Sequence, residues 1–523
     1  MNEQQVSIYD TTLRDGTQGL GLAFSKEDKL RVAIELAKFG MEYIEGGWPS
    51  SNTKDKDFFK EAKFINFGRS KLAAFGSTRK PNTSVSKDKQ ILDLIDAQTP
   101  VITIFGKTWK MHVEDVLCTT VRENCNMIRE TVQFLKKHDK EVIYDAEHFF
   151  DGFKADPDHA LETLHAATDA NTIVLCDTNG GTMTDEIKDI TKHVVSIFDR
   201  KIGIHTHNDC GLGVANAIAA IRSGATQVQG TINGYGERTG NCNLTTLLPN
   251  LQLKLNIPGT QDLTCLKTLS KFIDELGNCI PNPREPFVGE TAFTHKGGMH
   301  VNAVHKVARS YEHIDPTCVG NTTKILISEL SGQSNIILKA ANIGYNLEKG
   351  SNEVLQLLQK IKALEAEGYE FEVADASFEL LIRRLLGKHT PLFKLKEYHC
   401  SLRRQGTSTK SCEATVKLSI NGKTEYTVAE GDGPVNALDL ALRKALIPTY
   451  PWIADIALKD YKVRIIDGTQ GTAAKTRVLI ESSAGKLRWC TVGCDANIIE
   501  ASWKAIVDSF EYYSLNSPQN KCE

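Results

Sequence analysis

The stretch Val6-Ser-Ile-Tyr9, followed by Asp10-Thr-Thr-Leu-Arg-Asp-Gly-Thr-Gln-Gly19 and then by the amphipathic segment Lys26–Phe39, decides the fold of the first half of this chain. A short β-type run followed by a helix of this length predicts one βα unit. Comparable runs recur as far as Ile232, and segments such as Val121–Lys137 and Asp158–Asp169 lie between them as further helices. The expected strands are Val6–Tyr9, Tyr43–Gly46, Lys71–Phe75, Val101–Phe105, Glu141–Asp145, Thr172–Cys176, Ile202–Thr206 and Gln227–Ile232.

Eight βα units over about 250 residues are typical of a TIM barrel. An open doubly wound sheet is the alternative, but it does not account naturally for the polar side chains beyond the strands. These side chains gather just past the carboxyl ends of several strands, where barrel enzymes place their catalytic groups. They are Asp15, Glu147, Thr178, His205, His207 and Asn241. The sequence therefore predicts one polar rim on an apolar α/β barrel.

Three of these side chains form a candidate metal site. His205 and His207 are two residues apart at the end of a strand, so they face the same side and can converge on one ion. Asp15 can join them if the first strand lies beside the seventh. Three protein ligands leave coordination positions open, as in a catalytic site. Two histidines and one carboxylate also fit non-haem iron oxygenases, but those enzymes usually have antiparallel sandwich folds, and no such pattern occurs here.

Composition describes an ordinary globular protein. The 523 residues are 41% hydrophobic and 24% charged, and this length predicts more than one domain. A formal net charge of −3 favours neither nucleic acid nor an anionic membrane as a partner. We find neither a membrane-spanning apolar run nor a signal peptide, and expect a cytoplasmic protein. The thirteen cysteines are scattered without a C-x-x-C pair, which favours buried thiols over disulfides or structural zinc.

The chain beyond the expected barrel divides into a helical part and a mixed part. We expect a catalytic domain over 1–260, helical linker subdomains over 261–390 and an α+β domain over 391–523. The breakers in Leu386-Gly-Lys-His-Thr-Pro391 favour the second boundary. The expected helices before it are Cys265–Leu276, Lys324–Leu330, Glu353–Glu367 and Ala376–Leu386.

The last domain contains an internal repeat. Asn436-Ala-Leu-Asp-Leu-Ala-Leu-Arg443 matches Asn497-Ile-Ile-Glu-Ala-Ser-Trp-Lys504 at an offset of 61 residues (497 minus 436), and each helix is expected to follow a loop containing Gly431 or Gly493. Two βββα units should pack together, because one unit alone cannot bury its apolar face. Their expected strands are Tyr398–Arg403, Ala414–Ile420 and Thr424–Val428, then Val463–Ile466, Arg477–Glu481 and Leu487–Val492.

Three independent motifs, in the right order, carry a family resemblance. Asp10–Gln18 matches D-x-T-L-R-D-G-x-Q, His205–Asp209 matches H-x-H-N-D, and Gly236–Asn241 matches G-E-R-x-G-N. The chain resembles the metal-dependent acyltransferases that include 2-isopropylmalate, homocitrate and citramalate synthases. The resemblance runs over nearly the whole chain. It implies a Claisen-type condensation of acetyl-CoA with an α-keto acid, assisted by Mn²⁺, Mg²⁺ or Zn²⁺.

The resemblance also implies roles for individual residues. The implied metal ligands are Asp15, His205, His207 and Asn241, the substrate-binding residues are Arg14, Gln18 and Thr178, and the catalytic residues are Arg14, Glu147, His300 and Tyr311. Ordinary structural roles compete with three of them. Arg14 could be a surface or salt-bridged arginine, Thr178 a helix N-cap, and Glu147 a salt-bridged carboxylate at the rim. Asp145 and His148 are close enough to Glu147 to share its role.

His300 lies in Phe293-Thr-His-Lys-Gly-Gly-Met-His300, which resembles a family segment whose histidine, with a companion tyrosine matched by Tyr311, reaches the active site of the other subunit. A homodimer is therefore implied. His295, His300 and His305 recur every five residues, so spacing alone does not single out His300. In the family the βββα domain binds the end-product amino acid; a purely structural dimerisation module is the alternative.

Three rim segments, Phe105–Trp109, Asp145–Gly152 and Gly234–Asn243, look most like the citramalate synthase branch. That branch condenses pyruvate with acetyl-CoA to give (R)-citramalate on the route to isoleucine, which makes isoleucine the expected effector. Three alternatives remain open: 2-isopropylmalate synthase acting on 2-oxoisovalerate, an aldol-type lyase using the same metal site, and an amino-acid sensor on an inactive barrel.

Overall fold

The computed structural model describes residues 5–325, 333–405, 409–466, 471, 473–485 and 487–516. It divides into two compact units, Met1–Phe293 with Ile314–Thr322, and Thr294–His313 with Thr323–Glu523. Within the described residues, no helix is both long and apolar enough to cross a membrane.

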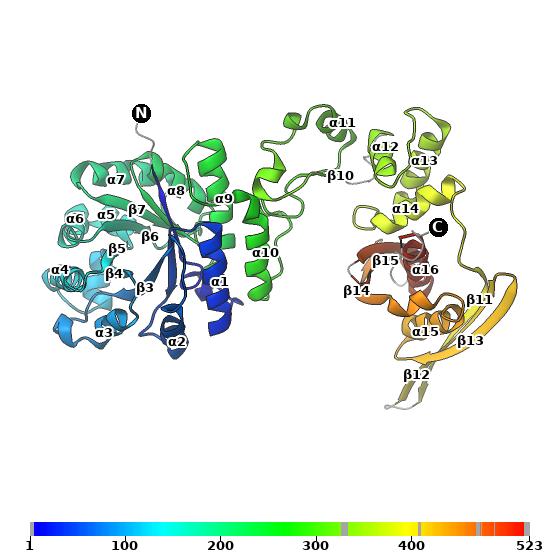
Figure 1. Cartoon of the computed structure of the whole chain (residues 1–523), viewed down its shortest axis with the longest axis horizontal. Helices are drawn as coiled ribbons and strands as arrows, with labels where there is room; N and C mark the ends of the chain where they lie inside the picture. Colours follow the sequence, from blue (N-terminus) through cyan, green and yellow to red (C-terminus); the bar gives the residue numbers. More distant parts are fainter. Residues whose placement is uncertain are drawn as a thin grey trace. The chain divides into compact units, whose positions relative to one another are not determined.

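The first unit is built on a closed barrel of eight parallel strands in sequential order (Figure 1). The TIM-barrel prediction is confirmed, and the open doubly wound sheet is wrong because β8 pairs with β1. The last expected strand stops at Gly230, two residues early, because Ile232–Gly234 forms a 3-10 turn. The strands are β1 (Ser7–Asp10), β2 (Tyr43–Gly47), β3 (Lys71–Ser77), β4 (Val101–Lys107), β5 (Glu141–Glu147), β6 (Thr172–Asp177), β7 (Lys201–Thr206) and β8 (Gln227–Gly230).

Helices surround the barrel, and their ends follow from local sequence. Ser25 and Asp28 form a capping box at the start of α1, and Gly40 ends it in the left-handed region at φ 96°. The predicted bounds of α1 and α4 are confirmed residue for residue. The helices of this unit are α1 (Lys26–Phe39), α2 (Thr53–Ala62), α3 (Lys89–Asp96), α4 (Val121–Lys137), α5 (Phe149–Ala155), α6 (Pro157–Ala166), α7 (Thr184–Ile197), α8 (Gly213–Arg222), α9 (Leu244–Pro249) and α10 (Leu266–Leu276).

The two faces of the barrel strands carry different side chains. The outward residues join the large apolar core beneath the helices. The inward residues form a smaller apolar cluster of Tyr9, Tyr43, Ala73, Val101, Ile143, Val174 and Cys176. Two residues further along β2, β4 and β5, the same inward face carries Glu45, Thr103 and Asp145, all buried. The barrel therefore encloses an apolar layer with a buried polar layer on the side toward the strand ends.

The second unit begins with helices and a two-stranded sheet. Helix was predicted over 324–330, but Lys324–Ile325 is strand β10, paired in parallel with β9 (Thr294–His295), and residues 326–330 lie outside the described part. Pairing with a distant segment outweighs local preference in so short a strand. The helices are α11 (Gly298–Lys306), α12 (Gln333–Asn342), α13 (Asn352–Ala366) and α14 (Asp375–Leu385).

The predicted βββα repeat is present. Two antiparallel three-stranded sheets each precede one helix, and both repeats contribute to a single apolar core. The elements are β11 (Lys394–Gln405), β12 (Thr409–Ile420), β13 (Lys423–Gly431) and α15 (Pro434–Leu446), then β14 (Ala457–Ile465), β15 (Thr476–Ala484), β16 (Leu487–Asp495) and α16 (Ile498–Asn516).

The loops expected around Gly431 and Gly493 are wrong. Gly431 ends β13, and Gly493 lies inside β16. A Cβ at Gly493 would lie 1.9 Å from the Ala501 carbonyl oxygen. Glycine is required here because the helix backbone packs directly on the strand.

Candidate active site

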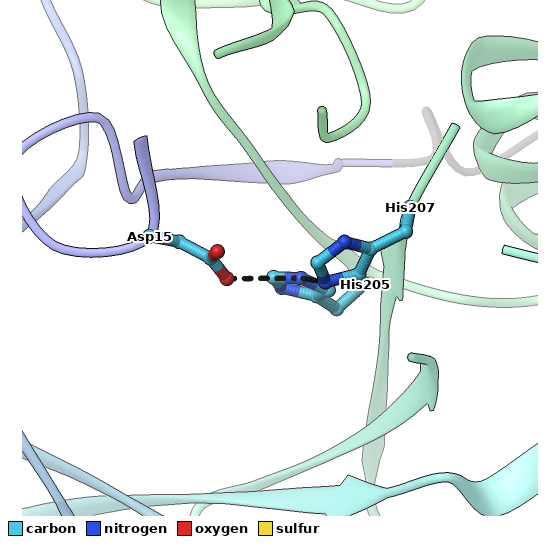
Figure 2. A group of neighbouring side chains, drawn as sticks. All are labelled: Asp15, His205 and His207. Atoms are coloured by element: carbon cyan, nitrogen blue, oxygen red, sulfur yellow. Dashed lines mark hydrogen bonds and ion pairs between the residues drawn. The ribbon is translucent and has the colours of Figure 1, made fainter. Parts of the chain in front are cut away.

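Asp15, His205 and His207 converge at the end of the barrel where the strands finish. One ligand atom from each lies within 4.8 Å of the other two, and all three residues are buried (Figure 2). His205 Nε2 lies 3.4 Å from Asp15 Oδ2 and 3.3 Å from His207 Nε2. β7 places His205 on the inner face of the barrel, and His207 follows one residue after the strand, in a bridge with Asn241.

The loop after β1 brings Asp15 to the two histidines. The Asp15 N–H donates to Thr11 Oγ1 at 3.3 Å, and the Gly16 N–H donates to the Thr11 carbonyl oxygen at 3.1 Å. A short 3-10 turn, Gly16–Gln18, follows at once. The chain therefore folds back over the end of β1, which places the carboxylate across from β7.

The protonation states of this cluster suit a divalent cation. Burial alone would raise the pKa of Asp15, but the Arg14 guanidinium and the two imidazoles outweigh it and lower this pKa to about 2. Burial, with His205 beside it, lowers the pKa of His207 to about 3. At neutral pH the set is one carboxylate and an uncharged imidazole at position 207, the forms that ligate metals. Asp15 Oδ1 is buried without a hydrogen-bond partner among the described residues, as expected for an oxygen that has a ligand to bind.

Asn241 lies at the edge of this cluster. Its Nδ2 donates to the Tyr235 carbonyl oxygen at 3.0 Å, and its Oδ1 is buried with no hydrogen-bond partner in the described chain. Gly240 precedes it at φ 95°, and a Cβ there would lie 1.9 Å from the Gly234 carbonyl oxygen. The turn that presents Asn241 therefore needs glycine at this position. Ligation by Asn241 stays a prediction.

Arg14 is held on three sides. Its Nε donates to Glu45 Oε2 at 2.6 Å, its Nη1 lies 3.0 Å from Asp15 Oδ2, and its guanidinium carbon is 3.7 Å from the centre of the Phe75 ring. Tyr9 and Thr11 also donate hydroxyl protons to Glu45, which is fully buried. Arg14 is thus salt-bridged, but inside the site and not at the surface.

Glu45 was not among the site residues predicted from the sequence. It is the only charged residue in the segment Tyr43–Gly47, and every residue of that strand is buried. A lone carboxylate inside an apolar strand was the available signal, because a buried charge requires a partner.

Glu147 and Thr178 lie on neighbouring strand ends. Glu147 is the last residue of β5 and forms an ion pair with Lys107, the last residue of β4. In this structure Glu147 is therefore a salt-bridged carboxylate at the rim, as the structural alternative expected. Thr178 Oγ1 accepts a hydrogen bond from the His148 N–H at 2.8 Å. The alternative role of Thr178 as a helix N-cap is wrong, because the next helix begins at Thr184 with Met183 as its cap.

The two neighbours of Glu147 are occupied differently. Asp145 points into the barrel and accepts a hydrogen bond from Gln229 at 2.8 Å; burial, with Glu45 nearby, raises its pKa to about 8. The His148 ring lies 4.4 Å from the His112 ring, and its Nδ1 is 3.4 Å from Asp151 Oδ2. Neither Asp145 nor His148 has its side chain at the rim position that Glu147 occupies.

These groups open onto one cavity of about 190 Å³. Its polar lining collects Arg14, Asp15, Gln18, Glu147, Thr178, His205 and His207, so seven of the predicted site residues meet there. Trp48, Phe75 and Phe105 form an aromatic wall that was not predicted, with Trp48 edge-on to both phenylalanine rings at 5.6 and 5.7 Å. Nothing in the local sequence marked Trp48 or Phe75, because aromatic residues near strand ends are most often core; Phe105 lies in a rim segment that carries the family resemblance, but no role was predicted for its ring.

His300 and Tyr311 belong to the second unit. Their rings stack with centroids 4.2 Å apart, and both side chains are exposed. His295 differs from His300, because its Nε2 lies 3.4 Å from Glu312. The side chain of His305 lies outside the described residues. The action of His300 and Tyr311 on a barrel stays a prediction.

Comparisons with known proteins place the chain. A family model described as HMGL-like matches residues 5–273, one described as homocitrate synthase post-HMGL domain-like matches 287–369, and the LeuA allosteric (dimerisation) domain matches 372–514. The chain belongs to the HMGL-like family of barrel enzymes.

Individual relatives show which members of this family the chain most resembles. An (R)-citramalate synthase from Aquifex aeolicus is 53% identical, covering 97% of this chain and 98% of its own, and one from Geobacter sulfurreducens is 48% identical with 97% of each chain covered. A 2-isopropylmalate synthase from Methanocaldococcus jannaschii is 29% identical over 96% of this chain and 94% of its own. Within the HMGL-like family the chain therefore belongs with the (R)-citramalate synthases, and the 2-isopropylmalate synthases are more distant.

Proposed function

We propose that this protein joins acetyl-CoA to pyruvate and hydrolyses the thioester, giving (R)-citramalate and CoA. The observation that carries the proposal is the single cavity shared by Arg14, Thr178, Glu147 and the Asp15–His205–His207 cluster. In this reaction a cation polarises the carbonyl of the α-keto acid, and a hydrogen-bond donor binds its carboxylate. The cluster that could hold the cation and the hydroxyl group of Thr178 face the same cavity. The near full-length identity to (R)-citramalate synthases supports the same reading.

We assign each residue a part that is compatible with its contacts. Thr178 accepts from the His148 N–H, so its own hydroxyl proton is available to the keto-acid carboxylate. Arg14, fixed by Glu45, donates to the carbonyl oxygen as negative charge develops there. Glu147, at the rim, takes the methyl proton of the acetyl group, the resulting carbon attacks the ketone carbon of pyruvate, and the ketone oxygen gains a proton from solvent to become the hydroxyl group. Water then cleaves the thioester and CoA leaves.

The residues fit a resident divalent metal, which Asp15, His205 and His207 would hold, with Asn241 as a further ligand. When bound, Mn²⁺, Mg²⁺ or Zn²⁺ supplies Lewis-acid polarisation of the keto-acid carbonyl.

The acceptor is proposed to be pyruvate because the cavity is small and walled by Trp48, Phe75 and Phe105. A methyl group fits against such a wall more readily than the isopropyl group of 2-oxoisovalerate. Each extra methylene is worth about 1–3 kcal/mol of discrimination, so the two additional carbons give a measurable difference in kcat/KM.

The second unit is proposed to regulate and complete the site. We infer catalytic, linker and regulatory regions over 1–260, 261–390 and 391–523, a homodimer in which His300 and Tyr311 act on the partner's barrel, and isoleucine as the effector of the region matched by the LeuA domain.

The test measures CoA release from acetyl-CoA with Mn²⁺, comparing pyruvate with 2-oxoisovalerate, each with and without isoleucine. We expect faster release with pyruvate and slower release when isoleucine is added. Preference for 2-oxoisovalerate would move the protein to the alternative synthase. No release with either keto acid would contradict the proposed condensation, and would leave the lyase and sensor alternatives.

A further inference from the structure

A buried glutamine side chain contacts one of the candidate metal ligands. Gln229 is on β8, directly beside His205 of β7 in the parallel register, and is fully buried. Its Oε1 lies 2.8 Å from His205 Nδ1, and its Nε2 donates to Asp145 Oδ1 at 2.8 Å. Asp145, Gln229 and His205 therefore form a continuous hydrogen-bonded chain inside the barrel, which ends at a candidate metal ligand.

The direction of this chain follows from the chemistry of its members. The NH₂ group of Gln229 donates to Oδ1 of Asp145, which accepts whether the carboxyl group is ionised or carries its proton on Oδ2, so the carbonyl oxygen of Gln229 faces the imidazole. A carbonyl oxygen only accepts, and His205 Nδ1 must then carry a proton. In a neutral ring the lone pair is left on Nε2, the atom that lies 3.3 Å from His207 Nε2 and 3.4 Å from Asp15 Oδ2.

We infer that Gln229 is a positioning residue that fixes the Nδ1–H tautomer of His205 and thereby presents Nε2 to the metal. Metal-bound histidines characteristically donate their second N–H to such a partner, and removing the partner costs about 10–100-fold in metal affinity. His207 is different, because its Nδ1 has no hydrogen-bond partner in the part of the chain that the structure describes. Of the two imidazoles, His205 has its tautomer fixed by a hydrogen bond to Gln229, and His205 is therefore the pre-oriented ligand.

The same strand offers a matched control. Gln227 is two residues before Gln229, so it faces the same side of β8, and it is also buried, at 3% exposure. Its Oε1 accepts no hydrogen bond within the described residues. Gln227→Met and Gln229→Met make the same chemical change on the same face of one strand, but only the second removes an acceptor from a candidate ligand.

The experiment measures the Mn²⁺ dissociation constant of the full-length protein and of its Gln229→Met, Gln229→Glu and Gln227→Met variants. We expect Gln229→Met to raise Kd about 10–100-fold. Gln229→Glu, which keeps an oxygen acceptor for Nδ1–H, should lose much less than about 10-fold in affinity, and so should Gln227→Met. An unchanged Kd in folded Gln229→Met overturns the inference, and so does an equal loss in Gln227→Met or in Gln229→Glu.

A second measurement reads the tautomer in the wild-type protein itself and uses a variant only to assign the signals. In metal-free protein labelled with ¹⁵N-histidine, the His205 signals, identified by their loss in His205→Gln, should show the protonated nitrogen at Nδ1. A proton on Nε2 would overturn the inference. The inference rests on the proposed metal site but not on the keto acid. A protein that binds Mn²⁺ and turns over another acceptor contradicts the proposed function alone, whereas wild-type protein that binds none of Mn²⁺, Mg²⁺ and Zn²⁺ contradicts both.

Discussion

The Nε of Arg14 and the Oε2 of Glu45 are 2.6 Å apart in the interior of the barrel, where Glu45 is wholly shielded from solvent. When a buried arginine is held in one geometry, the directions in which it can donate hydrogen bonds are fixed, because its guanidinium group is planar and rigid. Glu45 takes one edge of that plane, and the ring of Phe75 lies 3.7 Å from its centre. The carboxylate on β2 therefore determines where the arginine after β1 can donate.

Arg14→Lys tests this aiming. Lysine keeps the positive charge beside Asp15 but lacks the planar fork, so it cannot satisfy Glu45 and donate to a substrate oxygen in the same geometry. We expect kcat to fall by about 10²–10³-fold, the usual loss when one donor to a developing oxyanion is removed. The Mn²⁺ Kd should change little. Wild-type turnover in Arg14→Lys would contradict the role given to the guanidinium.

His207→Ala tests the metal cluster. Loss of a protein ligand should remove bound Mn²⁺ and turnover together, because catalysis is assigned to the loaded site. Metal content by elemental analysis and CoA release with pyruvate are measured on the same sample. His193→Ala, on the exposed part of α7, is the control and should change neither. Full activity in His207→Ala without a bound ion would exclude this cluster as the metal centre.

Asp145 predicts a pH dependence of stability in metal-free protein. Burial and the nearby Glu45 raise the pKa of its carboxyl in the folded state to about 8, whereas in the unfolded chain it is near the ordinary value. Between those values the folded state holds a proton that the unfolded state has lost. Stability from this group is complete at low pH and is lost as pH rises towards about 8, by at most about 1.4 kcal/mol per pH unit.

The measurement compares Tm of wild type and Asp145→Asn in EDTA from pH 5 to 9. The asparagine does not titrate, so Tm of the variant should gain on that of the wild type with rising pH and level off above about pH 8. A constant difference across this range would show that Asp145 has an ordinary pKa in the fold.

Mixed dimers test the action of His300 across subunits. His207→Ala and His300→Ala homodimers should both be inactive. If His300 serves the partner's barrel, a heterodimer of the two has one complete site, and random mixing restores about one quarter of wild-type activity. If both residues serve the same barrel, the heterodimer has no complete site. Activity that stays at the level of the homodimers after subunit exchange is confirmed would therefore contradict the assignment across subunits.

Much of this architecture was predictable because its signals are local. Each barrel strand is a short apolar run between turns, and His205 and His207 share a face by strand periodicity alone. The βββα repeat was visible because two helices carry the same pattern. The strand at Lys324–Ile325 was not, since its only support is a partner about thirty residues earlier.

The missed site residues share another cause. Glu45, Phe75, Phe105 and Gln229 lie on four different strands, and Trp48 directly follows β2. Each meets the groups that give it a role only when the barrel closes. An amide in Gln227–Gly230 is unremarkable until its neighbour on β7 is known to be His205. The neighbours that give such residues a role come from segments far apart in the chain, so their function is a property of the closed barrel.

The apolar layer of Tyr9, Tyr43 and Val101 inside the barrel has a consequence for the order of events. This layer closes the barrel interior on one side of the two histidines. The ion and the keto acid must therefore enter through the same opening, and the one that binds deeper must bind first and dissociate last. Metal exchange should for this reason be slowed by a bound keto acid, so that the ion stays in place from one turnover to the next.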